Sequence, residues 1–222
     1  MAKFPKILHI PSSLGLSRGD KRLDSIDSFL KREVVFTLKL DGSNVCLTRD
    51  NLYARSHSGK PIHPSFAWLK AFHSYVKYDI PENMEVFCEY TYAVHTIKYK
   101  TLPGYLWIIG IRVDGKLWLS WDDIKKWSRD LGIFVAPFLC YTFSSNERAF
   151  NAMANFAETK VKEGLYGVED EGFVIRVTDA FSNEDFSKSV AKWVRKDFVP
   201  VGTEHWTKGD FVKQELCIIN AE

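Results

Sequence analysis

Short runs in which apolar and polar residues alternate recur along this chain, and they constrain its fold more than any other feature of the sequence. The first two runs, VVFTLKL and SNVCLTR, flank Asp41-Gly42 within residues 34–56. Alternation with period two is typical of a β-strand, and Asp-Gly between two such runs is a common hairpin turn. We therefore expect a β-hairpin over this segment.

Lys39 stands just before the expected turn. Phe36, Leu38 and Leu40 share one face of the first strand and should lie toward the core, whereas Lys39 belongs to the other face, which a simple hairpin leaves open to solvent. Two interpretations follow: a solvated surface lysine, or a nucleophile held at the end of a strand.

The rest of the pattern predicts more strands together with three helices. Strands are expected over residues 84–94, 171–177 and 189–199, with a second hairpin over 105–121 that turns at Asp114-Gly115. Helices are expected over residues 65–76, 120–131 and 145–163, with Ser65 and Ser120 as N-caps, Gly132 and Gly164 as stops, and a further short helix over 24–31. This order indicates an α+β fold with mostly antiparallel sheets flanked by helices.

Composition excludes several classes of protein. A chain of 222 residues with 45% hydrophobic residues can bury a sizeable core, and we expect one domain over residues 1–222. The net charge of +2 excludes a uniformly basic nucleic-acid coat but allows a local basic groove. The four cysteines form no C-x-x-C pair, which indicates neither a zinc site nor a disulfide framework. No apolar run reaches the length of a signal peptide or a membrane span, so we expect a cytoplasmic protein without membrane contacts.

Six short motifs follow one another along the chain. They are KLDG at 39–42, ARSHSG at 54–59, VFCEY at 86–90, YLWIIGI at 105–111, DEGFVIR at 170–176 and AKWVRKDF at 191–198. In this order they resemble the covalent nucleotidyltransferases, which include ATP-dependent polynucleotide ligases and mRNA capping enzymes. The resemblance extends from Val34 to Phe198 and is greatest to RNA ligases of the phage nick-sealing type. It implies a nucleotidyltransferase (ATP-grasp-like) fold and an adenylyltransferase domain.

The resemblance identifies Lys39 as the nucleophile that attacks the α-phosphorus of ATP, releases pyrophosphate and forms lysyl-AMP. Only the neutral amine attacks, and we expect nearby cations and partial burial to lower its pKa. Asp41 and Gly42 would present Lys39 and approach the nucleotide closely. Asn44 would either fix this loop or contact the ribose.

Two further motifs supply candidates for binding ribose. Arg55 matches a position that contacts the ribose or the nucleic-acid end, and His57 and Lys60 are further phosphate candidates in the same loop. Glu89 matches a glutamate that accepts hydrogen bonds from the ribose hydroxyls, as a carboxylate is suited to do. The alternative is that Glu89, like Glu85, is simply a surface acid.

The resemblance also implies an aromatic side chain over the adenine and a carboxylate near the phosphates. Trp107 is the candidate for the aromatic and Tyr105 the alternative, although an apolar strand rich in aromatics is also typical of a core. Glu171 would hold or orient Mg²⁺ or Mn²⁺, since these ions prefer oxygen ligands. Its neighbours Asp170 and Glu169 could instead make the segment a solvated acidic loop.

Lys192 matches the phosphate-binding lysine of the last motif. The usual pattern has a second lysine two positions later, where this sequence has Val194. Arg195 and Lys196 are the candidates to replace it. Period-two alternation places Lys196, and not Arg195, on the face of Lys192, and the choice between them stays open.

The resemblance implies an ATP-dependent RNA ligase that acts in RNA repair. Its partner would be RNA with 3′-OH and 5′-phosphate ends, expected in a nicked duplex, and a separate end-healing kinase or phosphatase is a further candidate partner. Alternatives are an ATP-dependent DNA ligase, a capping guanylyltransferase core, and a module that binds nucleotide or RNA ends without catalysis. DNA ligases and capping enzymes usually carry an OB domain after the last motif. Because 24 residues follow Phe198, we expect no C-terminal OB domain here.

Overall fold

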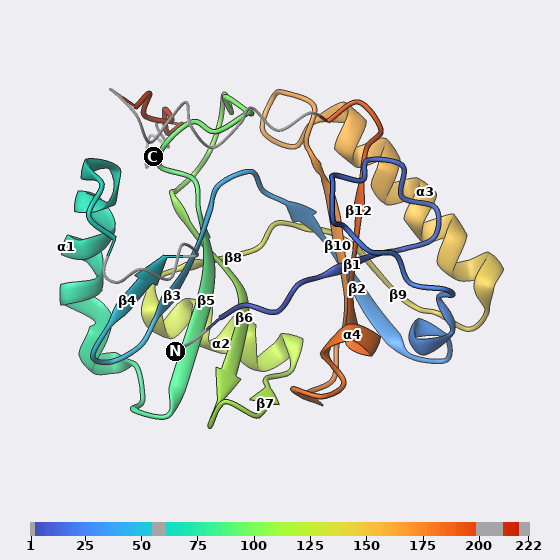
Figure 1. Ribbon diagram of the computed structural model, residues 1–222, viewed down its shortest axis with the longest axis horizontal. Helices are drawn as coiled ribbons and strands as arrows, with labels where there is room; N and C mark the ends of the chain where they lie inside the picture. The colour runs from blue at the N-terminus through green and yellow to red at the C-terminus, as the bar shows by residue number, and fades with distance from the viewer. Residues whose placement is uncertain (1–2, 55–60, 199–210, 218–222) are drawn as a thin grey trace, which may run out of the picture.

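The structure is a computed structural model that describes residues 3–54, 61–198 and 211–217. Within them the chain forms two β-sheets with helices around them (Figure 1). The strands are β1 (Leu8–His9), β2 (Glu33–Lys39), β3 (Ser43–Leu47), β4 (Leu52–Ala54), β5 (Met84–Tyr90), β6 (Leu106–Val113), β7 (Leu117–Trp118), β8 (Phe134–Val135), β9 (Phe138–Phe143), β10 (Gly172–Val177), β11 (Phe181–Ser182) and β12 (Val190–Val194). The α-helices are α1 (Ala67–Val76), α2 (Trp121–Leu131), α3 (Glu147–Glu163) and α4 (Phe186–Ser189), and the 3₁₀ turns are η1 (Asp27–Phe29), η2 (Pro64–Phe66) and η3 (Lys77–Asp79).

The two sheets have separate strand orders. The first runs β1-β12-β10-β2-β9, and the second runs β11-β7-β6-β5-β3-β4 with β8 paired to β6. The pairs β1–β12 and β6–β8 are parallel, and the other strand pairs among the described residues are antiparallel. Figure 1 shows α3 on the outer side of the first sheet and α1 on the outer side of the second. The predicted α+β fold with mostly antiparallel sheets and flanking helices is confirmed. Among the described residues, no helix is both long enough and apolar enough to span a bilayer.

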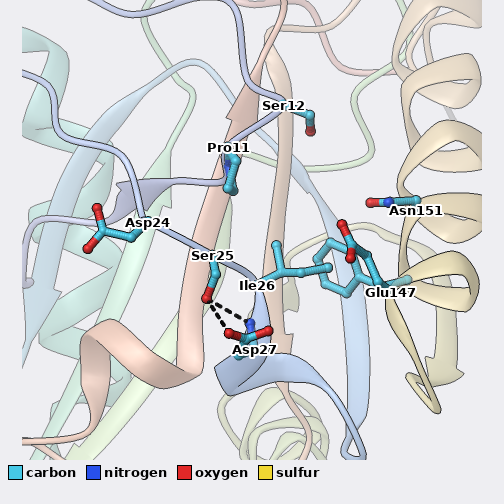
Figure 2. Close-up of a pocket in the computed structure, with 9 residues that line it drawn as sticks. Pro11, Ser12, Asp24, Ser25, Ile26, Asp27, Glu147 and Asn151 are labelled. Carbon is cyan, nitrogen blue, oxygen red and sulfur yellow. Dashed lines mark hydrogen bonds between the residues drawn. The ribbon is translucent and has the colours of Figure 1, made fainter.

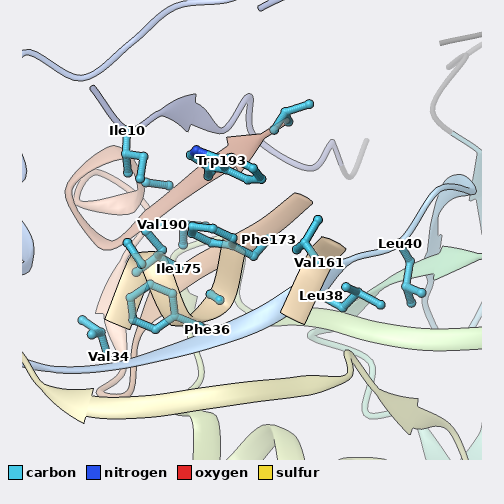
Figure 3. Packing of buried hydrophobic residues seen from close by; sticks show 14 of the residues in the cluster. Ile10, Val34, Phe36, Leu38, Leu40, Val161, Phe173, Ile175, Val190 and Trp193 are labelled. Atoms are coloured by element: carbon cyan, nitrogen blue, oxygen red, sulfur yellow. The ribbon is translucent and has the colours of Figure 1, made fainter. Parts of the chain in front are cut away.

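Aromatic side chains hold the central strands of the first sheet together (Figure 3). The rings of Phe36 on β2 and Phe173 on β10 lie 5.6 Å apart, and Phe173 stacks on Trp193 of β12 at 5.2 Å. Phe150 of α3 packs against Phe36 at 5.9 Å. Because buried aromatic rings contribute large apolar areas, this packing fixes the relative positions of β2, β10 and β12.

Apolar cores cover both faces of β5, an inner strand of the second sheet. Phe87 of β5 belongs to the core that includes Phe36, while its neighbours Val86 and Cys88 belong to a second core with residues of α1 and α2. Successive residues of β5 thus face opposite cores, as the period of two in a strand requires.

The hairpin predicted around Asp41-Gly42 is wrong. β2 pairs with β10 and β9 in the first sheet, whereas β3 pairs with β4 and β5 in the second. The face of β2 expected to be open to solvent is also buried, since Val35 is fully buried and Thr37 is 5% exposed. Strands buried on both faces are nearly continuous apolar runs. Val34, Val35 and Phe36 form such a run, whereas Thr37 and Lys39 give the rest of the strand an alternating pattern. The turn joins two sheets.

Other predicted elements form closely as expected. β6 and β7 make the second hairpin, and Asp114 (φ 53°) and Gly115 (φ 65°) both have the positive φ of a type I′ turn. Ser120 caps α2, which ends at Gly132 with φ 61°. Gly164 follows the end of α3.

Several predicted boundaries are wrong. The N-cap of α3 is Asn146, so the helix begins later than predicted, and His63, not Ser65, caps the turn before α1. The helix predicted over 24–31 is reduced to η1. The strands predicted over 84–94 and 189–199 end earlier, at Tyr90 and Val194. Local composition does not reveal where tertiary pairing stops.

Candidate active site

The ends of β2, β10 and β12 bring three predicted site residues together. In the β2–β10 register Lys39 is opposite the residue that follows Glu171. Thr37 and Lys192 are both opposite Val174, so these three share a face of the sheet. Lys39 lies on the same face as Thr37 by alternation. The side chains of Lys39 and Lys192 therefore emerge from the same face of the first sheet.

Lys39 and Glu171 form a direct ion pair. The Lys39 Nζ donates to Glu171 Oε2 at 2.7 Å, and the two side chains are 26% and 10% exposed. Burial raises the pKa of Glu171, although the charge and the hydrogen bond of Lys39 oppose that rise. The nucleophile predicted from the sequence is thus held at a strand end by a largely buried carboxylate.

Glu89 and Asn44 reach the site from the second sheet. They lie opposite one another on β5 and β3, and their side chains are hydrogen-bonded. Burial raises the pKa of Glu89 to about 7; repulsion from Glu171 and Asp41 adds to the rise, and attraction to Lys39 reduces it. Because these couplings act over short distances, Glu89 belongs to the same charge cluster. Unlike Glu89, Glu85 pairs with Arg112 at 2.5 Å.

The expectation that Lys39 has a depressed pKa is wrong for the free protein. Burial lowers its pKa, but the carboxylates of Glu171, Glu89 and Asp41 raise it by more, so the net direction is upward. Lys192 is the cation close enough to repel Lys39. Three carboxylates against one ammonium favour the protonated amine.

Asp41 and Gly42 fix the connection between the two sheets. Asp41 Oδ2 accepts hydrogen bonds from the backbone N–H groups of residues 96 and 97 at 2.7 and 2.8 Å, and the Asp41 N–H donates to the Tyr99 hydroxyl at 2.9 Å. A Cβ at Gly42 would stand 2.6 Å from the carbonyl oxygen of Tyr90. The glycine therefore permits a close approach between the backbones of the Asp41-Gly42 connection and the end of β5.

Lys192 has a partner that the sequence did not reveal. Its Nζ lies 3.5 Å from Asp20 Oδ2, with both side chains mostly buried. Burial and the charge of Lys39 lower the pKa of Lys192, whereas Asp20 and Glu171 act in the opposite direction. Asp20 belongs to a polar loop with no motif around it, so only the tertiary structure identifies it.

The two candidates for the second phosphate contact, Arg195 and Lys196, lie in different surroundings. Because β12 ends at Val194, alternation does not carry the face of Lys192 on to Lys196, which is exposed in a turn. Arg195 donates from Nε to the Asp170 carbonyl at 2.9 Å and pairs with Asp197 at 2.6 Å. The face-sharing argument for Lys196 is therefore wrong.

The aromatic candidates lie on different sides of the second sheet. Trp107 is opposite Glu89 in the register of β5 and β6, whereas Tyr105 packs in the core beside α1 and α2. The Trp107 ring is 2% exposed and packs against Phe134 and Tyr166 at 5.1 and 5.7 Å. Trp107 thus neighbours the site but fills the core, as the alternative interpretation of this strand predicts.

The acidic segment before β10 is only partly solvated. Glu169 is exposed, but Asp170 is fully buried, and burial raises its pKa to about 7. Its Oδ2 accepts a hydrogen bond from the backbone of Leu165 at 3.0 Å. The predicted contacts of Arg55, His57 and Lys60 lie outside the described residues.

The donor chemistry at Glu171 fits a divalent cation. In the part of the chain that the structure describes, no group of three or more His, Cys, Asp or Glu side chains is arranged to hold a metal. Mg²⁺, however, commonly binds one or two carboxylates and completes its shell with phosphate oxygens and water. The charge of Asp41 repels the carboxylate of Glu171, and the charges of Asp41 and Glu171 repel the carboxylate of Glu89. A cation beside Glu171 would relieve this repulsion.

A pocket of about 280 Å³ lies elsewhere, between the segment before β2 and the start of α3 (Figure 2). Its nine lining residues include Asp24, Asp27 and Glu147 and contain no lysine or arginine. Three carboxylates without a cation would repel a triphosphate. We therefore place the candidate nucleotide site at Lys39.

Comparisons with known proteins identify the family that this chain matches. The sequence model of the family described as RNA ligase matches residues 32–194, which include Lys39, Glu89, Glu171 and Lys192. Comparison with curated proteins gave no match.

Solved structures with a similar fold come from several organisms. A structure described as an archaeal ATP-dependent RNA ligase has a TM-score of 0.59 at 15% identity, with 88% of this chain and 48% of that chain covered. A putative ATP-dependent DNA ligase from Aquifex aeolicus has a TM-score of 0.54 at 16% identity, with 88% and 50% covered. A mutant RNA ligase from Naegleria gruberi, with ATP and Mn, has a TM-score of 0.55 at 15% identity, with 87% and 58% covered. At these identities the likeness shows the fold, and the chain spans about half the length of the archaeal protein.

Proposed function

This chain belongs to the RNA ligase family, and we propose that it is an ATP-dependent RNA ligase that works through a lysyl-AMP intermediate on Lys39. One observation carries the proposal. The amine of Lys39 is held 2.7 Å from Glu171 within the residues that match the family, on the same sheet face as Lys192 and beside Glu89. A bound nucleophile, a phosphate-binding cation and a sugar-binding carboxylate are the groups that nucleotidyl transfer needs.

In the first step Lys39, which the surrounding carboxylates keep protonated in the free protein, loses that proton to solvent, and the neutral amine attacks the α-phosphorus of ATP. An N–P bond forms, and the P–O bond to pyrophosphate breaks. The Lys192 ammonium attracts the negative charge of the phosphates. Glu89, held by Asn44, accepts hydrogen bonds from the ribose hydroxyls and so orients the nucleotide.

Glu171 has two tasks in this proposal. It positions the Lys39 amine before the reaction, and it is the carboxylate that would hold a divalent cation. Such a cation, when bound, offsets negative charge on the transferring phosphate. The Naegleria structure with ATP and Mn supports a nucleotide and a divalent cation as cofactors. We assign Mg²⁺ or Mn²⁺ to the position beside Glu171 in this proposal.

Two later steps complete the ligation. AMP passes from Lys39 to the 5′-phosphate of an RNA end, and the 3′-hydroxyl of the other end then attacks that phosphate and releases AMP. We place these steps in RNA repair on nicked duplexes, with a separate kinase or phosphatase that prepares the ends.

A DNA ligase is the second candidate, because the Aquifex structure carries that description. The test is a set of nicked duplexes with RNA or DNA on each side of the nick, assayed with ATP and Mg²⁺. We expect sealing when RNA supplies the 3′-hydroxyl. Equal or faster sealing of all-DNA nicks would assign the protein to DNA, and an adduct formed with GTP in place of ATP would assign it to capping.

A further inference from the structure

The segment that precedes β2 lies along the strand that carries Lys192. β1 pairs in parallel with β12, with His9 opposite Lys192 (Figure 1). The Ile10 N–H donates to the Lys192 carbonyl at 2.9 Å, and the Gly15 N–H donates to the Val194 carbonyl at 3.0 Å. A Cβ at Gly15 would stand 2.1 Å from the carbonyl oxygen of Arg195. The segment is therefore closely fitted to the backbone on both sides of Lys192.

Asp20 is the carboxylate that this segment brings to Lys192. The Lys192 Nζ lies 3.5 Å from Asp20 Oδ2, and the side chains are 15% and 16% exposed. Lys6 approaches the other oxygen, Oδ1, at 3.6 Å, but its own side chain is 53% exposed. The backbone N–H of Ser17 also donates to Oδ2 at 3.3 Å. Asp20 thus has a mostly buried cation on one side and an exposed cation on the other.

A buried histidine fixes Asp20. His9 Nε2 lies 3.0 Å from Asp20 Oδ2, and His9 Nδ1 lies 2.7 Å from the Ser13 hydroxyl. Burial and the charge of Lys192 lower the pKa of His9, so the ring is neutral. A carboxylate only accepts, so Nε2 carries the proton and Nδ1 accepts from Ser13. The Ser13 Oγ in turn accepts from the Val194 N–H at 3.0 Å. One ion pair and three hydrogen bonds therefore connect Lys192 to Val194, both on β12, through Asp20, His9 and Ser13.

The charges around Lys192 indicate where its ammonium would lie if Asp20 were absent. Lys39 repels Lys192, and Glu171, the other acceptor that attracts it, already binds Lys39 at 2.7 Å. Without Asp20, Lys192 would be drawn toward Glu171 and would compete with the nucleophile for it. With Asp20 in place, each lysine has its own carboxylate.

We propose that Asp20 is a positioning residue for Lys192, held in place by His9 and Ser13, and that it keeps the Lys192 ammonium at the phosphate site and away from the Lys39–Glu171 pair. The inference rests on the proposed function, in which Lys192 contacts the phosphates of ATP. It gives the segment before β2 an indirect part in binding the nucleotide, through Lys192.

The test measures the rate of AMP adduct formation against ATP concentration. Asp20→Asn should raise the KM for ATP about fivefold. This is the change in affinity expected from the loss of one ion pair that is mostly, but not fully, buried. Asp24→Asn is the matched control, because it removes the same charge from an exposed position four residues away and should leave KM within about twofold of wild type. Sealing of a nick adenylylated beforehand needs no ATP, so it should change by less than about twofold in either variant.

A double-mutant cycle separates positioning from a structural role. In a Lys192→Ala background, Asp20→Asn should change the KM by less than about twofold, because its target is gone. The same loss with and without Lys192, or no loss in either background, would overturn the inference. If Asp20→Asn does not fold, as judged by circular dichroism, Asp20→Glu replaces it with the same expected dependence on Lys192. A wild-type protein that forms no AMP adduct would contradict the proposed function itself, whereas an adduct with an unchanged KM in Asp20→Asn would overturn this inference alone.

Discussion

Replacing Glu89 by glutamine should stabilise the free protein at alkaline pH. Burial is the main cause that raises the pKa of Glu89 to about 7, from an ordinary value of 4.5. The difference is about 2.5 pH units, and each unit corresponds to about 1.4 kcal/mol. The ionised carboxylate therefore costs the folded protein up to about 3 kcal/mol at pH 8.

The effect has a definite pH dependence. Between the ordinary pKa and the raised pKa the folded protein binds more protons than the unfolded chain, so wild-type stability falls as pH rises from about 4.5 to about 7. Glutamine does not titrate and can keep the hydrogen bond to Asn44. The gain from Glu89→Gln should be about 3 kcal/mol at pH 8 and less than about 1 kcal/mol at pH 5. For a domain of this size, the gain at pH 8 should raise Tm by about 6 °C or more.

The assay is urea or thermal unfolding of both proteins at pH 5 and pH 8, with Glu85→Gln as the control on the same strand. Glu85 pairs with Arg112 at 2.5 Å, so its loss should destabilise the protein by about 1–3 kcal/mol. A Glu89→Gln protein that is no more stable than wild type at pH 8, or equally stabilised at both pH values, would refute the reasoning. The same variant should raise the KM for ATP, because glutamine offers the ribose one neutral acceptor oxygen in place of two charged ones, and so should show stability gained at the expense of function.

Further substitutions test individual groups of the site. Glu171→Ala should slow AMP adduct formation by at least about 100-fold while circular dichroism shows an intact fold, since the amine loses its partner and the cation its ligand; near wild-type rates at saturating Mg²⁺ would contradict this. Lys192→Ala should slow adduct formation at limiting ATP by about tenfold or more. Lys196→Ala should stay within about twofold of wild type, because that side chain is exposed in a turn; the reverse ranking in single-turnover assays would show that Lys196 is the phosphate contact.

The sequence predicts much of this fold because its strands alternate clearly and its turns carry specific residues. Asp114-Gly115 makes a local hairpin, and Ser120 and Gly132 bound a helix, since each signal acts within a few residues. Asp41-Gly42 carries the same hairpin signal, but most of the strands that pair with β2 and β3 are distant in sequence. Alternation within a strand does not identify its pairing partners.

The candidate site likewise combines residues that local motifs predict with features that depend on contacts between distant segments. Lys39, Glu89, Glu171 and Lys192 are marked by motifs, and the structure brings them together, although their roles stay predictions. The raised pKa of Lys39 could not be predicted, because it depends on Glu171 and Glu89 from two distant segments as well as on the neighbouring Asp41. Asp20 could not be predicted either, because its contact with Lys192 spans most of the chain.

The most direct test of the account is the mass of the purified protein after incubation with ATP and Mg²⁺, followed by peptide mapping. We predict one added AMP on Lys39, stable to base and labile to acid as a phosphoramidate is. Lys39→Ala should form no adduct, and neither should Lys39→Arg, because a guanidinium stays protonated. Lys39→Ala should nevertheless seal a nick that was adenylylated beforehand. No adduct on the wild-type protein, an adduct that persists in Lys39→Ala, or one that maps to another lysine would contradict the account.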